Sequence, residues 1–209
     1  MPDLYIITGS NGAGKSSVGL HYLPENVKYT IFDGDKLFMQ KSREFWKKGI
    51  KSHKECKKLA IEIVEKTFEN LMENAINNRS DFAYEGHFTN DATWDIPKKF
   101  KNHGYTLTLV FFGLTDTNLS QLRVIGRTKE GGHYVEPDTL AANFYGNLEK
   151  LDIYYPIFDT VKIFDTSTTE HIELAQIENG IPVFSEPELP EWFTSNLKDI
   201  TEKIKGDKN

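Results

Sequence analysis

Short apolar runs alternate along the chain with longer segments in which apolar residues recur every three or four positions. The apolar runs predict strands at residues 4–8, 29–32, 81–85, 105–112 and 161–164. The periodic segments predict helices at residues 15–22, 53–78, 91–101, 119–127 and 137–151. Such alternation predicts a three-layer α/β/α fold with a mainly parallel sheet and right-handed crossovers.

The longest helical signal, residues 53–78, carries a single apolar stripe that we expect in the core. Its members are Ala60, Ile61, Val64, Phe68, Leu71, Met72, Ala75 and Ile76. In the predicted helix 91–101, Pro97 is expected to break or kink the backbone. The strand 105–112 is apolar enough to be buried on both faces, as in a parallel sheet.

The end of the chain follows a different pattern. Asn179-Gly180 separates two short apolar runs, 173–177 and 181–184, which predicts a β-hairpin. A charged amphipathic helix is predicted at 191–204. Because the sequence shows no linker or internal repeat, we expect a single domain over residues 1–209, with a core at 4–166 and a C-terminal hairpin and helix at 171–205.

Residues 9–16, Gly-Ser-Asn-Gly-Ala-Gly-Lys-Ser, match the phosphate-loop pattern GxxxxGK[ST] between a predicted strand and a predicted helix. Glycine adopts backbone angles barred to other residues, and the loop amides and the following helix favour anions. We therefore predict nucleotide binding by Gly9, Ser10, Asn11, Gly12, Ala13, Gly14, Lys15, Ser16 and Ser17. Lys15 is expected at the outer phosphates, and the Ser16 hydroxyl on Mg²⁺. The alternative is an ordinary glycine-rich turn with an exposed lysine.

Acidic residues follow the next two predicted strands. Asp33 and Asp35 lie two apart in an extended segment, so their side chains point to the same side. We predict that Asp33 holds Mg²⁺ through water and that Asp35 is the general base for a substrate hydroxyl. The alternative is a turn in which an aspartate caps a helix. Glu85 is predicted to bind substrate or organise Mg²⁺, or else to be a surface carboxylate.

His87 is either a ligand contact or an exposed loop histidine. In parallel sheets, ligands collect at the carboxyl ends of the strands. We therefore expect the loop at 9–16, the pair Asp33 and Asp35, and Glu85 to gather at one edge of the sheet.

Two basic regions complete the candidate chemistry. Arg123 and Arg127 lie four apart, on one face of a predicted helix, and precede Gly131-Gly132. We expect these arginines to lie on a mobile lid, residues 115–137, and to stabilise the charge of a transferring phosphoryl group. The alternative is a pair of surface arginines. The stretch 36–58 is rich in Lys and Arg, and it is interpreted either as a solvated helical surface or as a basic wall around an anionic substrate.

Composition narrows the class of partner. The 209 residues carry a net charge of −6, which argues against nucleic acid as a bulk electrostatic partner. The one cysteine, Cys56, fits a reducing compartment and is expected to be a plain free thiol. There is no signal peptide pattern and no apolar run long enough for a transmembrane helix, so a cytoplasmic protein without a membrane partner is expected.

The combination of these motifs resembles the zeta-toxin-like group of phosphate-loop kinases, in its stand-alone bacterial branch. The resemblance covers residues 4–166, and its most specific part is GGH-x-V-x-P at Gly131–Pro137. It implies a P-loop NTPase fold of the kinase type, ATP with Mg²⁺ as donor, and a small hydroxyl-bearing acceptor. Toxin members phosphorylate a UDP-linked amino sugar and pair with an antitoxin protein. By match to the motifs, Lys15 and Ser16 would hold phosphates and Mg²⁺, Asp35 would be the base, and Arg123 and Arg127 would serve the lid.

The chain departs from this family pattern at two places. Residues 140–144, Leu-Ala-Ala-Asn-Phe, stand where the family carries an arginine cluster, and Glu85-Gly86-His87 stands where it has Glu-Thr-Thr. The leading hypothesis is an ATP-dependent kinase of a small metabolite. The second is a nucleotide-binding regulatory module with weak or lost catalysis. A simple ATPase ranks lower, because the strand 105–112 ends in Gly113-Leu114-Thr115-Asp116 and not in a paired carboxylate.

Overall fold

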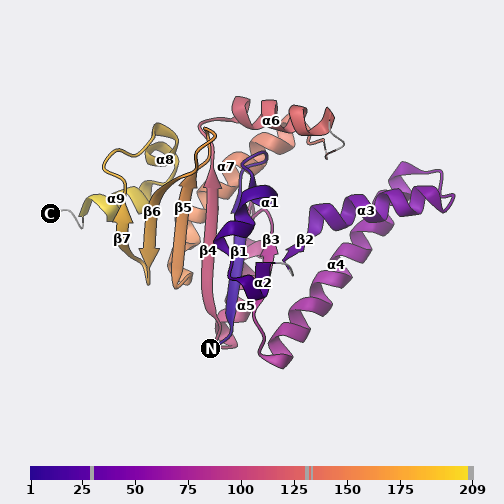
Figure 1. Cartoon of the computed structure of the whole chain (residues 1–209), viewed down its shortest axis with the longest axis horizontal. Coiled ribbons are helices and arrows are strands. Elements are labelled where there is room, and N and C mark those ends of the chain that lie inside the picture. The colour runs from indigo at the N-terminus through magenta and orange to yellow at the C-terminus, as the bar shows by residue number, and fades with distance from the viewer. Residues whose placement is uncertain (29–30, 130–131, 133, 207–209) are drawn as a thin grey trace.

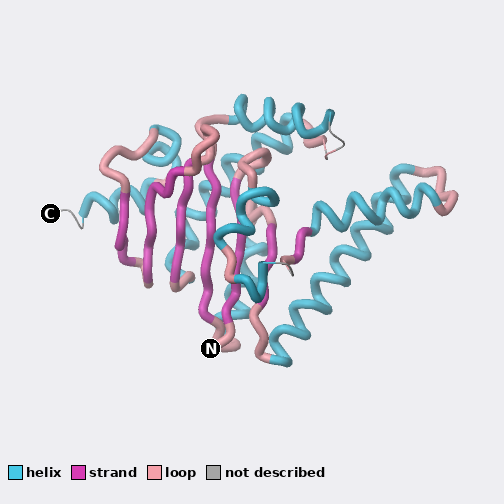
Figure 2. The backbone as a smooth tube through the Cα atoms, in the orientation of Figure 1, coloured by secondary structure: helices cyan, strands magenta, loops and turns pink. Residues whose placement is uncertain are grey.

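The computed structural model describes residues 1–28, 31–129, 132 and 134–206. Within them one mixed sheet has the strand order β2-β3-β1-β4-β5-β6-β7, and the strands lie side by side in Figure 2. The strands are β1 (Asp3–Gly9), β2 (Phe32–Asp33), β3 (Phe82–Glu85), β4 (Thr106–Gly113), β5 (Thr160–Asp165), β6 (Ile172–Glu178) and β7 (Ile181–Ser185). The pairs from β2 to β5 are parallel, and β6 and β7 add antiparallel strands at one edge.

Helices cover both faces of this sheet, with α7 and α5 behind it and α1 and α2 in front in Figure 1. The α-helices are α1 (Lys15–Val18), α2 (Glu25–Lys28), α3 (Gly34–Lys47), α4 (His53–Asn78), α5 (Asp95–Asn102), α6 (Thr117–Lys129), α7 (Pro137–Tyr154), α8 (Glu191–Asn196) and α9 (Lys198–Gly206). Short 3₁₀ turns are η1 (Gly19–Tyr22), η2 (Asp91–Trp94) and η3 (Tyr155–Ile157). The predicted three-layer α/β fold with a mainly parallel sheet is confirmed.

The centre of the sheet is β1 paired with β4, and it is the best buried part of the core. Leu107, Leu109 and Phe111 on one face of β4, and Val110 and Phe112 on the other, are almost fully buried, as expected for a parallel strand between two helical layers. At the end of β1, the backbone of Gly9 approaches β4 so closely that a Cβ atom would lie 2.1 Å from the Phe112 carbonyl oxygen. Only glycine therefore fits where β1 passes into the phosphate loop.

Helices α3 and α4 pack on each other and project away from the sheet (Figure 1). The Asp33 side chain caps α3 by accepting a hydrogen bond from the Lys36 amide. The Ser52 side chain caps α4 by accepting a hydrogen bond from the Glu55 amide. The prediction that the whole stripe of α4 lies in the core was wrong for Ile61 and Leu71, which are 47% and 40% exposed. The reason is that α4 extends beyond the sheet, and its main packing partner among the described elements is α3.

The predicted hairpin is confirmed as β6 and β7, with Asn179 and Gly180 both at positive φ in the turn. The predicted C-terminal helix is divided at Leu197 into α8 and α9. Asp152 of α7 accepts the backbone N–H groups of Asp199 and Ile200 and so caps α9.

Three other boundaries differ from the prediction. The second strand is confined to Phe32–Asp33, and residues 29–30 of the predicted strand lie outside the described residues. The predicted helix at 15–22 is α1 followed by the 3₁₀ turn η1. Pro97 sits in the first turn of α5, where a missing N–H is tolerated, and the 3₁₀ turn η2 precedes it. Across the described ranges, every helix is too short or too polar to cross a bilayer.

Candidate active site

The phosphate loop joins β1 to α1, and Lys15 lies at its end. Its Nζ donates hydrogen bonds of 3.0 Å to the carbonyl oxygens of Gly9 and Ser10. Lys15 is only 7% exposed, so the alternative of a turn with an exposed lysine is wrong. Burial lowers the pKa of this ammonium, while the nearby Glu85 and Asp35 carboxylates act in the opposite direction.

Some amides of the loop already have partners within the protein. Ser10 N–H donates to Phe112 O at 3.3 Å, Ala13 N–H to Ser10 O at 3.2 Å, and Ser17 N–H to Gly14 O at 3.1 Å. Several of the other predicted phosphate-binding residues line two adjoining cavities, of about 180 and 330 Å³. Asn11 lines the smaller cavity, Gly14 lines the larger, and Gly12, Lys15 and Ser16 line both.

The predicted carboxylates gather beside this loop, as the topology requires. Asp33 and Glu85 are partners in the β2–β3 register, at the carboxyl ends of the two strands. Asp33, Asp35 and Glu85 line a further cavity of about 320 Å³ together with Lys15 and His87. The structure thus brings the loop lysine and all three carboxylates to one edge of the sheet.

Glu85 is not a surface carboxylate. It is partly buried, and its Oε1 accepts a 2.9 Å hydrogen bond from the Ser16 hydroxyl. Burial raises the pKa of Glu85, Lys15 opposes this shift, and the negative charge of Asp33 adds to it. Three carboxylates around one cavity with a single lysine favour the uptake of a cation.

Asp33 has the structural role offered as the alternative, because its Oδ1 caps α3 at the Lys36 amide, 2.9 Å away. Capping occupies one oxygen and leaves lone pairs for a second partner. Asp35 lies in the first turn of α3 and lines the 320 Å³ cavity that it shares with Lys15 and Glu85. Capping and ligand binding are therefore compatible in this pair of aspartates.

The donor set around the loop fits magnesium bound with a nucleotide. The Ser16 hydroxyl and the Glu85 and Asp33 carboxylates are hard oxygen ligands, the type that Mg²⁺ prefers. Among the residues that the structure describes, no three His, Cys, Asp or Glu side chains form a complete metal cage. Mg²⁺ usually combines one or two protein ligands with phosphate oxygens and water, so such a cage is not required.

His87 is held by two asparagines. Its Nε2 lies 3.3 Å from the amide nitrogen of Asn11 in the loop, and its Nδ1 lies 3.1 Å from the amide nitrogen of Asn147 in α7. Burial lowers the pKa of His87 well below its usual range, and the positive charges of Lys15 and Arg127 lower it further. The imidazole is therefore neutral, and it lines the 180 and 320 Å³ cavities.

The two predicted lid arginines differ in their surroundings. The guanidinium of Arg123 donates to the carbonyl oxygens of Thr166 at 2.7 Å and Ser167 at 3.0 Å, so it ties α6 to the loop after β5. Arg127, one turn further along α6, lines both phosphate-side cavities. Gly132, whose backbone N–H donates to Arg127 O at 2.9 Å, turns the chain after α6. Gly131 and His133 of the GGH-x-V-x-P motif lie outside the described residues.

Polar side chains of α6 and α7 contact the phosphate loop and its surroundings, and the sequence did not predict them. Ser120 donates to Asn11 O at 2.6 Å, and Asn143 donates to Asn11 Oδ1 at 2.9 Å. Asn147, 1% exposed, accepts the Phe88 amide at 2.7 Å. The available signal was a pair of asparagines four apart in α7 among Leu140, Phe144 and Leu148, where a polar side chain needs a buried partner.

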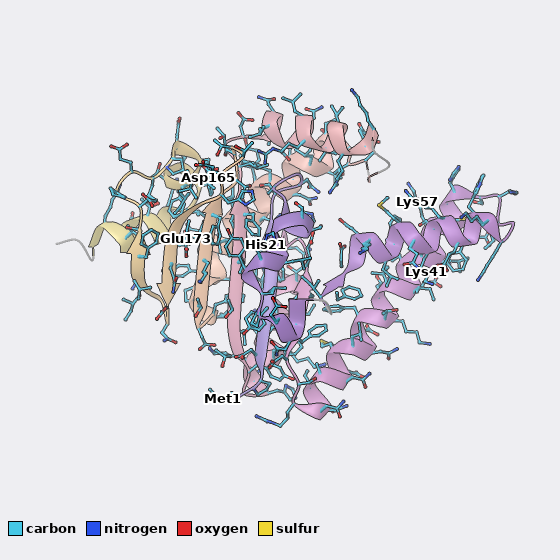
Figure 3. All side chains as sticks on the ribbon, viewed as in Figure 1. Met1, His21, Lys41, Lys57, Asp165 and Glu173 are labelled. Carbon is cyan, nitrogen blue, oxygen red and sulfur yellow. The ribbon has the colours of Figure 1, made fainter. Side chains whose placement is uncertain are left out.

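A larger cavity of about 710 Å³ lies between the α3–α4 pair and the segment 134–139 at the start of α7. Phe38 and Met39 form part of its wall and also line the smaller cavities around Asp35. Arg43, Lys47 and Lys57 add positive charge to its lining. Figure 3 shows Lys57 on the projecting α3–α4 pair, away from the sheet.

Comparison with solved structures finds chains of the same fold. A chain of the AvrRxo1-ORF1:AvrRxo1-ORF2 complex with sulphate ions superposes with a TM-score of 0.73 at 15% identity, covering 94% of this chain and 64% of that chain. A chain of the same complex with ATP superposes with a TM-score of 0.70 at 15% identity, covering 98% of this chain and 63% of that chain. A chain of the PezAT chromosomal toxin–antitoxin system of Streptococcus pneumoniae superposes with a TM-score of 0.61 at 18% identity, covering 98% of this chain and 88% of that chain.

At these identities the solved structures show a shared fold, and the present chain spans less than two thirds of the AvrRxo1 chains. No curated protein matches the sequence. The family model described as Zeta toxin, in contrast, matches residues 1–173, which include every site residue discussed above. The chain therefore belongs to the zeta toxin family.

Proposed function

We propose that the protein is an ATP-dependent kinase that transfers the γ-phosphate to a hydroxyl group of a small molecule. The observation that carries the proposal is the set of adjoining cavities in which Lys15 and Ser16 of the phosphate loop meet Asp35 and Glu85. This juxtaposition puts phosphate-binding groups and a candidate base within one site, which is the arrangement that phosphoryl transfer needs.

The phosphate loop and Arg127 would form the donor half of the site. Lys15 would leave the carbonyl oxygens of Gly9 and Ser10 and bind the outer phosphates of ATP. Arg127 would stabilise the charge on the transferred group, which is spread over its oxygens in the transition state. Ser16 with Glu85 and Asp33 would hold Mg²⁺, which neutralises phosphate charge. A neighbour of the same fold crystallised with ATP supports this half.

Asp35 would organise the acceptor half. Its carboxylate would accept the proton of the substrate hydroxyl while that oxygen forms its bond to the γ-phosphorus. The bond from the γ-phosphorus to the bridging oxygen breaks, and ADP leaves. The cavity of about 320 Å³ beside Asp35 provides the space for the hydroxyl-bearing end of the acceptor.

The larger cavity favours an acceptor with an anionic part, such as a nucleotide sugar. Arg43, Lys47 and Lys57 line it beside one acid, Glu136, which supports the hypothesis of a basic wall over that of a merely solvated surface. Phe38 and Met39 connect this cavity with the one around Asp35.

The proposal is tested by ATP consumption in the presence of a pooled small-molecule extract. The wild type should consume ATP faster when the extract is added. Asp35→Asn should abolish this stimulation and retain ATP binding by calorimetry. Asp95→Asn, an exposed aspartate in the first turn of α5, is the matched control and should behave as the wild type. An unchanged stimulated rate in Asp35→Asn would remove Asp35 from the role of base.

One observation favours a second candidate, a nucleotide-binding regulatory module with weak turnover. Residues 137–149 contain no Lys or Arg, and Asn143 of this segment bonds to the loop residue Asn11. The site therefore lacks α7 arginines to stabilise the transferred phosphate. Tight ATP binding without any phosphorylated product would favour this candidate.

Toxicity and an antitoxin-type partner are proposed from family membership and from the toxin–antitoxin system of the PezAT neighbour. A kinase of this type would act in the cytoplasm, where ATP is available, with no role for membrane or nucleic acid. Expression of the wild type should slow the growth of a bacterial host, and Lys15→Ala should not. Equal growth of the two strains would exclude a toxin role in that host.

A further inference from the structure

We infer that Asn11 is a positioning residue that transmits nucleotide binding at the phosphate loop to helix α7. The inference rests on the proposed ATP site and adds to it a route by which the loop and α7 move together. Asn11 occupies a position of the loop motif that accepts any residue, so the motif itself assigns it no function.

Three elements of the fold meet at Asn11, which is 5% exposed. Its backbone oxygen accepts from Ser120 of α6, its Oδ1 accepts from Asn143 of α7, and its amide nitrogen contacts His87 after β3. Phosphate-binding groups lie on both sides of it, because Lys15 holds the carbonyl of the preceding Ser10 and Gly12 lines the phosphate-side cavities.

Asn147 anchors the other end of this network. Its Oδ1 accepts the Phe88 amide at 2.7 Å and the Thr8 hydroxyl at 3.2 Å, and its amide nitrogen donates to Asn143 O at 2.6 Å. Its position is thereby fixed against β1 and against the segment after β3. A buried network in which each member is bonded several times is stiff, so a displacement at one end is passed to the other.

The hydrogen-bonding roles in the network are linked. The amide nitrogen of Asn147 lies 3.1 Å from Nδ1 of His87, and the other ring nitrogen, Nε2, lies 3.3 Å from the amide nitrogen of Asn11. Because Asn11 also accepts a hydrogen bond from Asn143 through its Oδ1, a rotation of the Asn11 side chain changes the contacts of both His87 and Asn143. The orientation of the Asn11 side chain is thus coupled to that of the Asn143 side chain in α7.

Nucleotide binding changes the environment of Asn11 directly. When Lys15 turns to the phosphates, the carbonyl oxygens of Gly9 and Ser10 lose their charged donor, and the loop must readjust next to Asn11. With the side chain of Asn11 present, the readjustment reaches α7 through Asn143. With alanine there, the backbone bond to Ser120 of α6 remains and the link to α7 is lost.

The test is hydrogen exchange of the full chain, with and without ATP and Mg²⁺, on the wild type, Asn11→Ala and Asn143→Ala. Asn118→Ala, an exposed asparagine of α6, is the matched control. In the wild type, nucleotide should slow exchange across residues 139–147 by about fivefold or more, the effect of one typical hydrogen bond. At ATP concentrations that saturate each variant, Asn11→Ala should show protection of the loop yet lose the protection of residues 139–147, whatever its affinity for ATP.

Protection of α7 that persists in Asn11→Ala would overturn the inference, and so would wild-type protein that binds ATP without protecting α7. Without nucleotide, each alanine variant should increase the rate of hydrogen exchange in residues 143–147. The increase in the double variant should be smaller than the sum of the two single increases. Unchanged exchange there also overturns it. A wild type that binds no ATP contradicts the proposed function, while this ligand-free comparison still decides the role of Asn11.

Discussion

Glu85 shows how a single residue of the site affects stability. Its carboxylate lies partly buried next to Asp33 and Asp35, and burial raises its pKa. A carboxyl group whose pKa is higher in the folded than in the unfolded state binds more protons when folded. The free energy of unfolding therefore falls as the pH rises through the titration of Glu85. At neutral pH the ionised group reduces stability, and a bound cation would offset this.

We predict that Glu85→Gln raises the midpoint of thermal unfolding of the ligand-free protein at neutral pH. The gain should shrink as the pH is lowered toward 4, because the wild-type carboxyl then becomes neutral as well. Differential scanning calorimetry across this pH range measures the effect. The exposed Glu202→Gln is the control and should change little. A lower midpoint for Glu85→Gln at neutral pH would show that the ionised carboxylate stabilises the fold and would contradict the prediction.

The two arginines of α6 should separate activity from stability. Arg127→Ala should lower the acceptor-stimulated rate by about 10²–10³, the typical cost of one donor to transition-state charge. Arg123→Ala should lower the free energy of unfolding by about 2 kcal/mol, because its charged hydrogen bonds to Thr166 and Ser167 are lost. Denaturant titration and turnover on both variants test this, and equal effects of the two would contradict it.

At the scale of elements, the C-terminal helix α8 packs closely on β4. A Cβ atom at Gly113 would lie 2.1 Å from Cη2 of Trp192, whereas one at Gly126 in α6 would meet no atom within 4 Å. We predict that Gly113→Ala destabilises the protein by about 1–3 kcal/mol through overpacking. Gly126→Ala, the matched control, should stabilise it by about 0.5–1 kcal/mol. Urea unfolding measures both, and a neutral Gly113→Ala would show that α8 moves freely on the sheet.

The elements also show what the sequence alone could predict. The motif at 9–16 and the acidic residues after β2 and β3 could be located because motif and strand order depend on local patterns. The stripe of α4 was predicted to lie wholly in the core because periodicity identifies an apolar face and not the element that covers it, and Ile61 and Leu71 remain exposed. The links from Asn143 and Asn147 to Asn11 and His87 depend on contacts across more than 50 residues, which a local pattern does not contain.

The described residues share one continuous core. Leu4 and Ile6 of β1 belong to the same buried cluster as Ile177 of β6 and Trp192 and Phe193 of α8. The segment after residue 173, beyond the family match, therefore completes the packing of the sheet. We predict a single cooperative unfolding transition, with calorimetric and van't Hoff enthalpies equal. Two separate transitions would contradict a single domain over residues 1–209.

Detection of a phosphorylated small molecule is the most direct test of whether the grouped site transfers phosphate. Purified wild type, Lys15→Ala and Asp35→Asn are each incubated with ATP, Mg²⁺ and a metabolite library, and the products are analysed by mass spectrometry. We predict one or more small molecules heavier by a phosphate with the wild type alone, although Asp35→Asn still binds ATP. Tight ATP binding by the wild type with no phosphorylated small molecule would contradict it.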